Sequence, residues 1–376
     1  MSKTRKYNNI IFMAYRNNKG ATGGPGGVLC LQKKLLGTEY QDIPLVYKFK
    51  NTRRFFSRLK GLYLGAFIQV FTRESFKLGN YYICNDIGTA FALACLHKKY
   101  SLIYHNQGPI LEENHNFKTI LTPRQKKRLL TVEKYAFKNA KSVHFPSKGA
   151  EDMFFNSPFR SIDKKNVNCG MVLPNTILEC ESCFEYPIVE GIKPEPQKST
   201  LLSVGTLTEA KGQDQVLDFL DIFLEIYQES VRYIVVGQGP LKENIVKKGQ
   251  QLEEQYSNFQ FIYIPRLNHT DILKLNFISD VYIMLHRLSI FDLATLEAMS
   301  QSSAIVLSDV GGNIDFNVEN NVILVSPVNY MAAAIKLANS NVKELKALNY
   351  KVFSNYFSPN NFKLYYEKLL NNITNQ

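Results

Sequence analysis

The sequence predicts an α/β protein with two doubly wound units, each built on a parallel sheet. Three observations lead to this prediction. A chain of 376 residues suffices for about two domains. Short apolar runs alternate with segments of helical periodicity, which is the pattern of successive βαβ units. The series stops at an irregular, proline-containing stretch and then begins again.

The first half contains four strand-like runs. NIIFMAY at 9–15 is followed by the glycine-rich turn KGATGGPGG at 19–27 and by a helical segment at 28–37. The later runs are YYICND, LIYHN and SVHFPS, at 81–86, 102–106 and 142–147. Strands separated by helices are expected to pair in parallel, with helices covering both faces of the sheet.

The second half repeats this alternation after a connection at 179–199, which has no period and contains several prolines and acids. Its strand-like runs lie at 200–205, 232–239, 259–265, 281–286, 304–310 and 322–325. We expect helices at 214–229 and 270–279, a helix that begins near Leu293, and an amphipathic helix after Ser358.

The predicted domains are 1–192 and 193–355, and the C-terminal helix, 356–376, is expected to return to the first domain. Open sheets of this kind bind ligands at the carboxyl ends of their strands. Two such domains facing one another are therefore expected to form a cleft there.

Composition excludes several classes of protein. Hydrophobic residues make up 45% of the chain and charged residues 21%, an ordinary globular balance. The six cysteines are irregularly spaced, and Cys180 and Cys183 have no second pair with which to hold zinc. The basic N-terminus lacks a secretory h-region, and no apolar run is long enough to cross a membrane. A reduced, cytoplasmic setting is the expectation.

Charge is distributed unevenly along the chain. Residues 1–150 contain 26 Lys and Arg against seven Asp and Glu, whereas residues 151–376 contain 19 against 26. The charge of the first half therefore predicts an anionic partner, either a membrane surface or nucleic acid. No zinc, RNP-like or helix-turn-helix signature accompanies the charge, so a membrane surface is favoured over nucleic acid.

Two stretches of the second half have the chemistry of an anion site. Gly205 ends a strand, and Lys211 follows just before a helix, where a lysine suits a phosphate. Asp292 has the position of an N-cap, and the amides of the turn after it are available to an anion. Glu297, one turn further on, could accept hydrogen bonds from a diol. On local sequence alone, a surface loop with a solvated lysine is the better explanation of the first stretch, and an acid on a half-exposed helix face is the alternative for Glu297.

Five spaced segments together resemble the GT-B glycosyltransferases of family 4, enzymes that build bacterial surface glycans. They are VLPNTI, VGTLTEAKG, YIVVGQGPL, FIYIPRL and FDLATLEAMSQSSAIVLSDVGG. The resemblance covers the second half and, by the order of its elements, most of the first. It implies two Rossmann-like domains facing across a cleft, with the acceptor in the first and a nucleotide-sugar donor in the second.

The resemblance also implies roles for individual residues. Lys211 corresponds to the lysine that neutralises the donor diphosphate, and Glu297 to the second acid of a Glu-x7-Glu pattern that holds the ribose. His105 corresponds to a strand-end histidine near the reacting carbon. The implied donor-binding residues are Gly26, Gly27, Gly205, Thr206, Lys211, Pro265, Arg266, Leu267, Ser289, Phe291, Asp292, Leu293, Ala294 and Glu297.

Three positions depart from the family pattern. Ser289 stands where the first acid is expected, Thr206 where an arginine follows the glycine, and Asp292 where a glycine is usual. These changes remove a charged contact to the sugar and a cation from the diphosphate, and they bring an acid close to the phosphates. Arg266 or Arg287 could compensate. They also leave open a second hypothesis, a catalytically eroded scaffold subunit with the same fold.

The reaction implied is transfer of a sugar from a nucleoside diphosphate, by default UDP, to a hydroxyl of a growing lipopolysaccharide, capsule or teichoic acid type glycan. Retention of configuration is expected. No metal and no other cofactor is expected, because Lys211 and helix amides meet the phosphate charge and no DxD motif is present. A nucleotide-sugar epimerase or hydrolase is a third hypothesis.

A lipid-linked acceptor would require contact with the inner face of the cell membrane. The segment 47–71 mixes cations with aromatic residues, and we expect it to be an interfacial helix. A helix that packs its aromatics inward explains the pattern equally well. The expected membrane-contact residues are Arg53, Arg54, Phe55, Phe56, Arg58 and Lys60. RQKKRLL at 124–130 is a second basic cluster.

Overall fold

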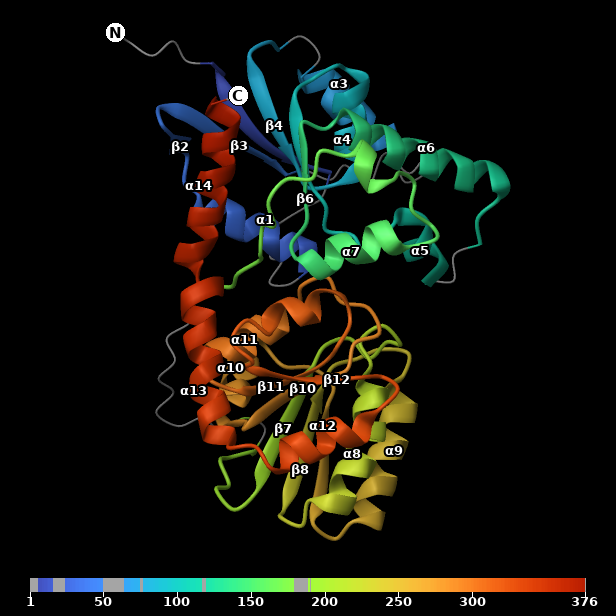
Figure 1. Cartoon of the computed structure of the whole chain (residues 1–376), viewed down its shortest axis with the longest axis vertical. Coiled ribbons are helices and arrows are strands. Elements are labelled where there is room, and N and C mark those ends of the chain that lie inside the picture. The colour runs from blue at the N-terminus through green and yellow to red at the C-terminus, as the bar shows by residue number, and fades with distance from the viewer. Residues whose placement is uncertain are drawn as a thin grey trace. The chain divides into compact units, whose positions relative to one another are not determined.

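The computed structural model describes residues 6–15, 24–49, 64–74, 77–116, 120–178, 189 and 191–375. The chain divides into two compact units, Met1–Thr176 with Pro359–Gln376, and Ile177–Ser358 (Figure 1). Each unit is an α/β fold around its own sheet, so the predicted fold class is confirmed. No helix in these described stretches is long and apolar enough to cross a bilayer.

The first unit is built on a six-stranded sheet with the order β2-β3-β1-β4-β5-β6. The pairing of β2 with β3 is antiparallel and all the others are parallel. Its strands are β1 (Asn9–Ala14), β2 (Glu39–Tyr40), β3 (Ile43–Phe49), β4 (Asn80–Cys84), β5 (Tyr100–Ile103) and β6 (Ser142–His144). Its helices are α1 (Gly24–Leu35), α3 (Leu64–Glu74), α4 (Ile87–Cys95), α5 (Ile110–Asn116), α6 (Pro123–Asn139), α7 (Lys148–Asn156) and α14 (Pro359–Asn375).

The position of strand β3 contradicts part of the helix that was expected over 47–71. Tyr47, Lys48 and Phe49 belong to this strand, which is paired in parallel with β1. Lys48 forms an ion pair with the buried Glu74 of α3, so its charge is used within the fold. The expected helix is therefore wrong over these three residues, because pairing with the central strand decides their conformation. The expected membrane-contact residues, 53–60, lie outside the described residues.

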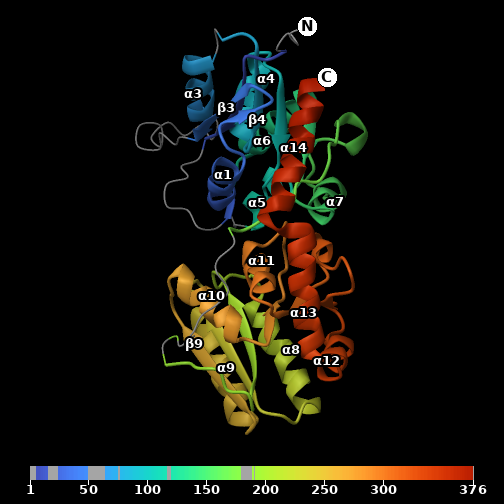
Figure 2. The ribbon, with the colours of Figure 1, turned by 90° about the vertical axis from the view of Figure 1, so that its left-hand side faces the viewer.

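The last helix completes the core of the first unit. Phe362, Tyr366 and Leu369 of α14 are buried in one cluster with β1 and β4 side chains such as Phe12 and Ile83. The Tyr366 hydroxyl accepts a hydrogen bond of 2.8 Å from the buried amide of Gln32 on α1. Figure 2 shows α14 running alongside the strands of this unit.

The second unit is built on a wholly parallel sheet with the order β12-β11-β10-β7-β8-β9. Its strands are β7 (Ser199–Val204), β8 (Val231–Val236), β9 (Phe259–Ile264), β10 (Val281–Met284), β11 (Ala304–Ser308) and β12 (Val322–Val325). Its helices are α8 (Gln213–Ile226), α9 (Lys242–Gln255), α10 (His269–Ile278), α11 (Leu293–Ser300), α12 (Tyr330–Ala338) and α13 (Val342–Val352). This is the doubly wound order in which the first and fourth strands meet at the switch point.

Alternate side chains of these strands enter two separate cores. Val235 and Ile283 pack with α8, α9 and α12 on one face, and Ile234 and Tyr282 pack with α10, α11 and α13 on the other (Figure 1). A sheet buried on both faces needs apolar side chains in both directions, which explains the uninterrupted apolar runs of the sequence.

The boundaries between the units differ from the predicted 192/193 and 355/356. Ile177, Val189 and Ile192 are buried in the second unit, so these three residues are part of that unit's core. Phe353 and Phe357 are buried in the same cluster. The chain therefore passes from the first unit to the second at 176/177 and returns at 358/359.

Candidate functional site

The candidate site of the second unit lies at the switch point of its sheet. Strands β7 and β10 are neighbours there, and β7 continues into Gly205 whereas β10 continues towards α11. The carboxyl ends of both strands lie at the same edge because the strands are parallel. Ligands of open α/β sheets bind at this point, since the loops diverge on either side of it.

A cation, an anion and an imidazole meet at this edge. Lys211 Nζ lies 2.6 Å from Asp292 Oδ1 and 3.5 Å from His286 Nε2. The Lys211 side chain keeps a quarter of its surface exposed, whereas the His286 side chain is almost completely buried. A positive charge is thus held in place by buried partners and still reaches solvent.

Burial and charge set the protonation of this group. Burial, reinforced by the charge of Lys211, lowers the pKa of His286 to about 3. Burial alone would raise the pKa of Asp292, but the nearby Lys211 outweighs it and the pKa is lowered to about 2. At neutral pH the site therefore contains a neutral imidazole beside a charged lysine–aspartate pair.

Asp292 is also the N-cap of α11, as the sequence predicts. Its carboxylate accepts a hydrogen bond from the Thr295 amide at 3.2 Å. Leu293 and Ala294 form the first turn after it and are half-buried. Amides at these two positions have no partner within a helix and carry the positive end of its dipole. Lys211 and the start of α11 consequently both contribute positive potential at the loop between β10 and α11.

Glu297 lies one turn into α11 and is paired with a histidine. His269 Nε2 lies 2.8 Å from Glu297 Oε1, and the Glu297 side chain is mostly buried while His269 is half-exposed. The hydrogen bond with Glu297 raises the pKa of His269 despite the opposing effect of burial. Glu297 therefore has a partner that the sequence analysis missed.

Ser289 and Phe291 occupy the loop between β10 and α11. Ser289 is buried, and within the described part of the chain its hydroxyl has no hydrogen-bond partner. Its carbonyl accepts a hydrogen bond from Gly312 at 2.8 Å. The Phe291 ring is stacked on Phe316 at 4.3 Å and meets Phe357 edge-on. The Phe291 side chain is thus a packing residue, and only its backbone is left to contact a ligand.

The loop after β7 is held by close contact between backbones. Gly205 has a φ of 154°, and a Cβ at Gly237, after β8, would lie 1.8 Å from the Gly205 carbonyl oxygen. Glycine is therefore required at Gly237 by packing. Thr206 is exposed, and its carbonyl accepts a hydrogen bond from Gln213. Its hydroxyl brings no positive charge to the loop.

Pro265, Arg266 and Leu267 form the loop after the edge strand β9. Pro265 and Arg266 are exposed and line a cavity of about 500 Å³ together with Tyr263 and the ion-paired Arg232. Lys211 and Glu297 do not line this cavity. The loop that was expected to bind the base therefore lines a cavity to which Lys211 and Glu297 do not contribute.

The remaining expected residues belong to the first unit. His105 follows β5 and is buried, with 7% of its surface exposed. Gly26 and Gly27 lie inside α1, which begins at Gly24, so the expectation that they precede the helix is wrong. Proline suits the first turn of a helix, and Pro25 is compatible with this earlier start.

A buried acid supports the loop that follows His105. Glu133 of α6 accepts hydrogen bonds from the Tyr104 hydroxyl at 2.8 Å and from the Ile110 amide at 2.9 Å. Burial raises the pKa of this carboxyl group. The sequence analysis did not single out Glu133, because its only local signal is an acid on the apolar face of a basic helix.

Comparison with known proteins bears on the fold and on the second unit. Residues 188–352 match the family described as glycosyl transferases, group 1. Comparison with curated proteins returns no match. Similar solved structures include one named OtsA apo structure, at 11% identity and a TM-score of 0.66, with 95% of this chain and 98% of that chain covered.

Two further solved structures have the same fold. An α,α-trehalose-phosphate synthase (UDP-forming) from Burkholderia vietnamiensis is 12% identical with a TM-score of 0.65, and a sucrose-phosphate synthase from Thermosynechococcus elongatus is 14% identical with a TM-score of 0.62. In both cases 97% of this chain and 98% of that chain are covered. The chain thus has the GT-B fold and carries a group 1 glycosyltransferase domain, and the protein is a glycosyltransferase.

Proposed function

We propose that this glycosyltransferase moves a sugar from a UDP-sugar to a hydroxyl group of a growing cell-surface glycan, with retention of configuration. The observation that carries the proposal is Lys211, which lies beside the start of α11 within the matched domain. A diphosphate at that position meets one fixed cation and two helix amides. An anion site of this kind needs no other special feature.

In the proposed reaction the bond between the sugar C1 and the donor diphosphate oxygen breaks, and the acceptor hydroxyl oxygen forms the new bond to C1. Negative charge grows on the leaving diphosphate, where Lys211 and the amides of Leu293 and Ala294 stabilise it. These groups meet the phosphate charge in place of a metal. The acceptor hydroxyl passes its proton to the leaving diphosphate oxygen as the new bond forms on the same face of the sugar.

Glu297 is proposed to hold the ribose. Its carboxylate can accept two hydroxyl hydrogen bonds, and one of its oxygens is already oriented by His269. The loop of Pro265, Arg266 and Leu267 is proposed to contact the base through its backbone. In the first unit, Gly26, Gly27 and His105 are proposed to contribute to the sugar and acceptor side.

Uridine and retention are proposed from shared fold. One similar structure is described as trehalose-6-phosphate from E. coli bound with UDP-2-fluoro glucose, and another title concerns glycosyl transfer with retention in a trehalose-6-phosphate synthase. The surface-glycan acceptor, the lipid anchor and the location at the inner membrane face rest on the family 4 resemblance and on the basic first half of the sequence.

Nucleotide binding tests the proposal most directly. Thermal shifts would be measured with UDP, GDP, ADP, CMP and TDP, for the natural chain and for Lys211→Met. A nucleotide at roughly 100 times its Kd stabilises by about 2.7 kcal/mol, a shift of several degrees. We expect UDP alone to give this shift and Lys211→Met to remove most of it. No shift with any nucleotide would reject a donor site.

One observation favours a second candidate, a scaffold with an eroded donor site. Asp292 neutralises Lys211, and neither Ser289 nor Thr206 supplies a charge. Release of UDP from UDP-sugars in the presence of acceptor glycan distinguishes the two. Turnover that Lys211→Met abolishes supports the transferase, whereas nucleotide binding with no turnover for any donor supports the scaffold.

A further inference from the structure

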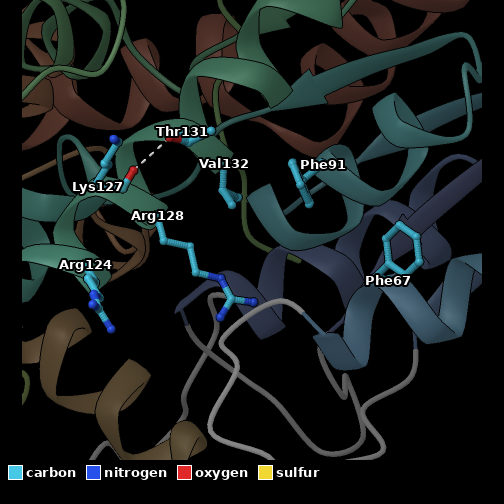
Figure 3. Close-up of a pocket in the computed structure, with 7 residues that line it drawn as sticks. All are labelled: Phe67, Phe91, Arg124, Lys127, Arg128, Thr131 and Val132. Carbon is cyan, nitrogen blue, oxygen red and sulfur yellow. Dashed lines mark hydrogen bonds between the residues drawn. The ribbon is translucent and has the colours of Figure 1, made fainter.

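The first unit contains a pocket that the donor chemistry does not use. It has a volume of about 430 Å³ and lies between α3, α4 and α6 (Figure 3). Its lining residues are Phe67, Phe91, Arg124, Lys127, Arg128, Thr131 and Val132. Figure 3 shows Arg128 in the middle, with the other two cations on one side and the two aromatic rings on the other. One end of the pocket is therefore cationic and the other apolar.

The cationic end is one stripe of α6. Arg124, Lys127, Arg128 and Thr131 recur at the three- and four-residue spacing that places side chains on one helix face. The opposite face of the helix, with Glu133 and Phe137, is buried, and Val132 lies at the border between the two faces. All three cations are exposed, and within the described residues none of them has an acidic partner.

This arrangement is unfavourable for the helix itself. Like charges three and four residues apart repel one another, and cations in the first turns oppose the helix dipole. Thr122 and Gln125 form a capping box, but the first turn contains no acid. An anion bound from outside would relieve both effects.

The apolar end explains why a phosphate alone does not complete the pocket. Phe67 and Phe91 are only half-buried, and Phe67 is stacked on Phe71, whose side chain is 48% exposed. Val132 closes the apolar side. Half-buried aromatic rings beside unpaired cations match a ligand that carries an anionic head and a hydrocarbon tail.

We propose that this pocket binds one anionic phospholipid of a bilayer. The phosphate lies among Arg124, Lys127 and Arg128, and the first part of an acyl chain lies against Phe67, Phe91 and Val132. The inference builds on the membrane location proposed above but not on the donor chemistry. It places the contact on described residues and does not depend on the segment 53–60.

Vesicle sedimentation tests the cationic end. The probes are phosphatidylcholine vesicles with and without phosphatidylglycerol, and no nucleotide is added. Each cation near an anionic leaflet contributes about a fivefold gain in binding, so Arg124→Gln/Lys127→Gln/Arg128→Gln should bind anionic vesicles roughly 100-fold more weakly. The matched control is Lys126→Gln/Lys138→Gln/Lys141→Gln, which removes the same charge from exposed positions outside the pocket. Equal losses in the two variants would overturn the proposal.

The absence of tryptophan from the chain allows a second test. The Phe67→Trp variant has a single indole in the pocket, and the Phe159→Trp variant has one at an exposed position of the same unit. Acyl-brominated phosphatidylglycerol should quench the fluorescence of the Phe67→Trp variant strongly and that of the Phe159→Trp variant weakly. Equal quenching would overturn the proposal even if the vesicles bind.

Two competitors separate the sources of the anion. Millimolar inorganic phosphate should leave vesicle binding unchanged. If phosphate displaces the vesicles, the ligand of the pocket is a free phosphate and the lipid proposal is overturned. A single-stranded oligonucleotide that displaces the vesicles at low concentration would overturn the proposal in favour of nucleic acid. Thermal shifts with UDP report on the second unit. If the natural chain gives the UDP shift but does not bind anionic vesicles, this inference is refuted and the proposed donor chemistry stands.

Discussion

Two groups of cations, one in each unit, differ in whether they have an acidic partner. In the second unit, Lys211, Arg232 and Arg287 each form an ion pair of 2.6–2.8 Å with an acid of the same unit. In the first unit, Arg124, Lys127 and Arg128 have no such acid within the described residues. A cation that an internal acid holds in place has a fixed orientation, which suits a defined ligand. Cations without an internal acid need a counter-charge from outside the unit, which is what the lipid proposal supplies. The variants below test this difference.

The largest expected effect is a loss of stability that is confined to the first unit. Phe362→Ala removes a buried ring that α14 contributes to that unit, and we expect it to cost about 3–5 kcal/mol of unfolding free energy. Hydrogen exchange should rise in β1 and β4 and stay unchanged in β7 and β10. A uniform rise in both sheets would show that the units do not unfold separately. The exposed Leu364→Ala on the same helix is the control.

The next effect concerns the paired cation at the proposed donor site. Lys211→Met should lower kcat/KM by roughly 10²–10³-fold, because it removes a fixed charge from the leaving diphosphate. Lys248→Met is the matched control, since Lys248 forms an ion pair with Asp218 elsewhere in the same unit. Assays of UDP release measure both variants. Similar losses in the two would show that the effect comes from stability alone.

Glu297→Gln should weaken donor binding by roughly ten- to 100-fold, the range for hydrogen bonds to a charged group. Titration calorimetry with UDP measures this loss. The His269→Gln variant keeps the carboxylate and removes only its partner, so a smaller loss is expected. If His269→Gln has the larger effect, the histidine rather than Glu297 contacts the nucleotide.

Asp292→Asn keeps a good N-cap and removes the charge that neutralises Lys211. UDP should then bind about tenfold more tightly, on the order of one charge-assisted hydrogen bond. The same calorimetry measures it. Weaker binding in Asp292→Asn would instead show that Asp292 positions Lys211 for the phosphate.

The smallest effect is a pH dependence from the His269–Glu297 pair. The pKa of His269 is raised above its ordinary 6.5 in the folded protein, so the pair stabilises the fold below that pH. This stability is lost as the pH rises through the folded pKa. The imidazole is half-exposed, and we expect less than about 1 kcal/mol after solvent screening. Denaturant unfolding between mildly acidic and mildly alkaline pH should show this loss in the natural chain and not in Glu297→Gln.

The fold could be predicted because its signals are local. Apolar runs such as 281–286 and the N-cap Asp292 lie within a few residues of the elements that they specify. Strand β3 escapes such a prediction because its last residues, Tyr47 to Phe49, run into a segment of cations and aromatic residues. Only pairing with β1 makes them a strand. The start of α1 at Gly24 could not be predicted, because glycine favours a turn when no tertiary context is considered.

The site could be predicted only in part. Lys211 and Glu297 stand out by spacing, but their partners come from other elements. His286 follows β10 and His269 begins α10, and neither carries a sequence signal that links it to the lysine or the glutamate. Phe291 illustrates the converse. Its place in the loop suggests ligand contact, while its ring is packed between Phe316 and Phe357 from later parts of the chain.

The position of α14 has a consequence for synthesis. A chain that emerges from the ribosome in order displays β1 and β4 long before Phe362, Tyr366 and Leu369 exist to cover them. Domains that fold as they emerge normally do so from the N-terminus. Here the inserted second unit can fold first, and the unit that begins the chain is finished last. Until α14 is made, the apolar side chains of β1 and β4 lack this cover, and a chaperone that binds apolar surface would act there.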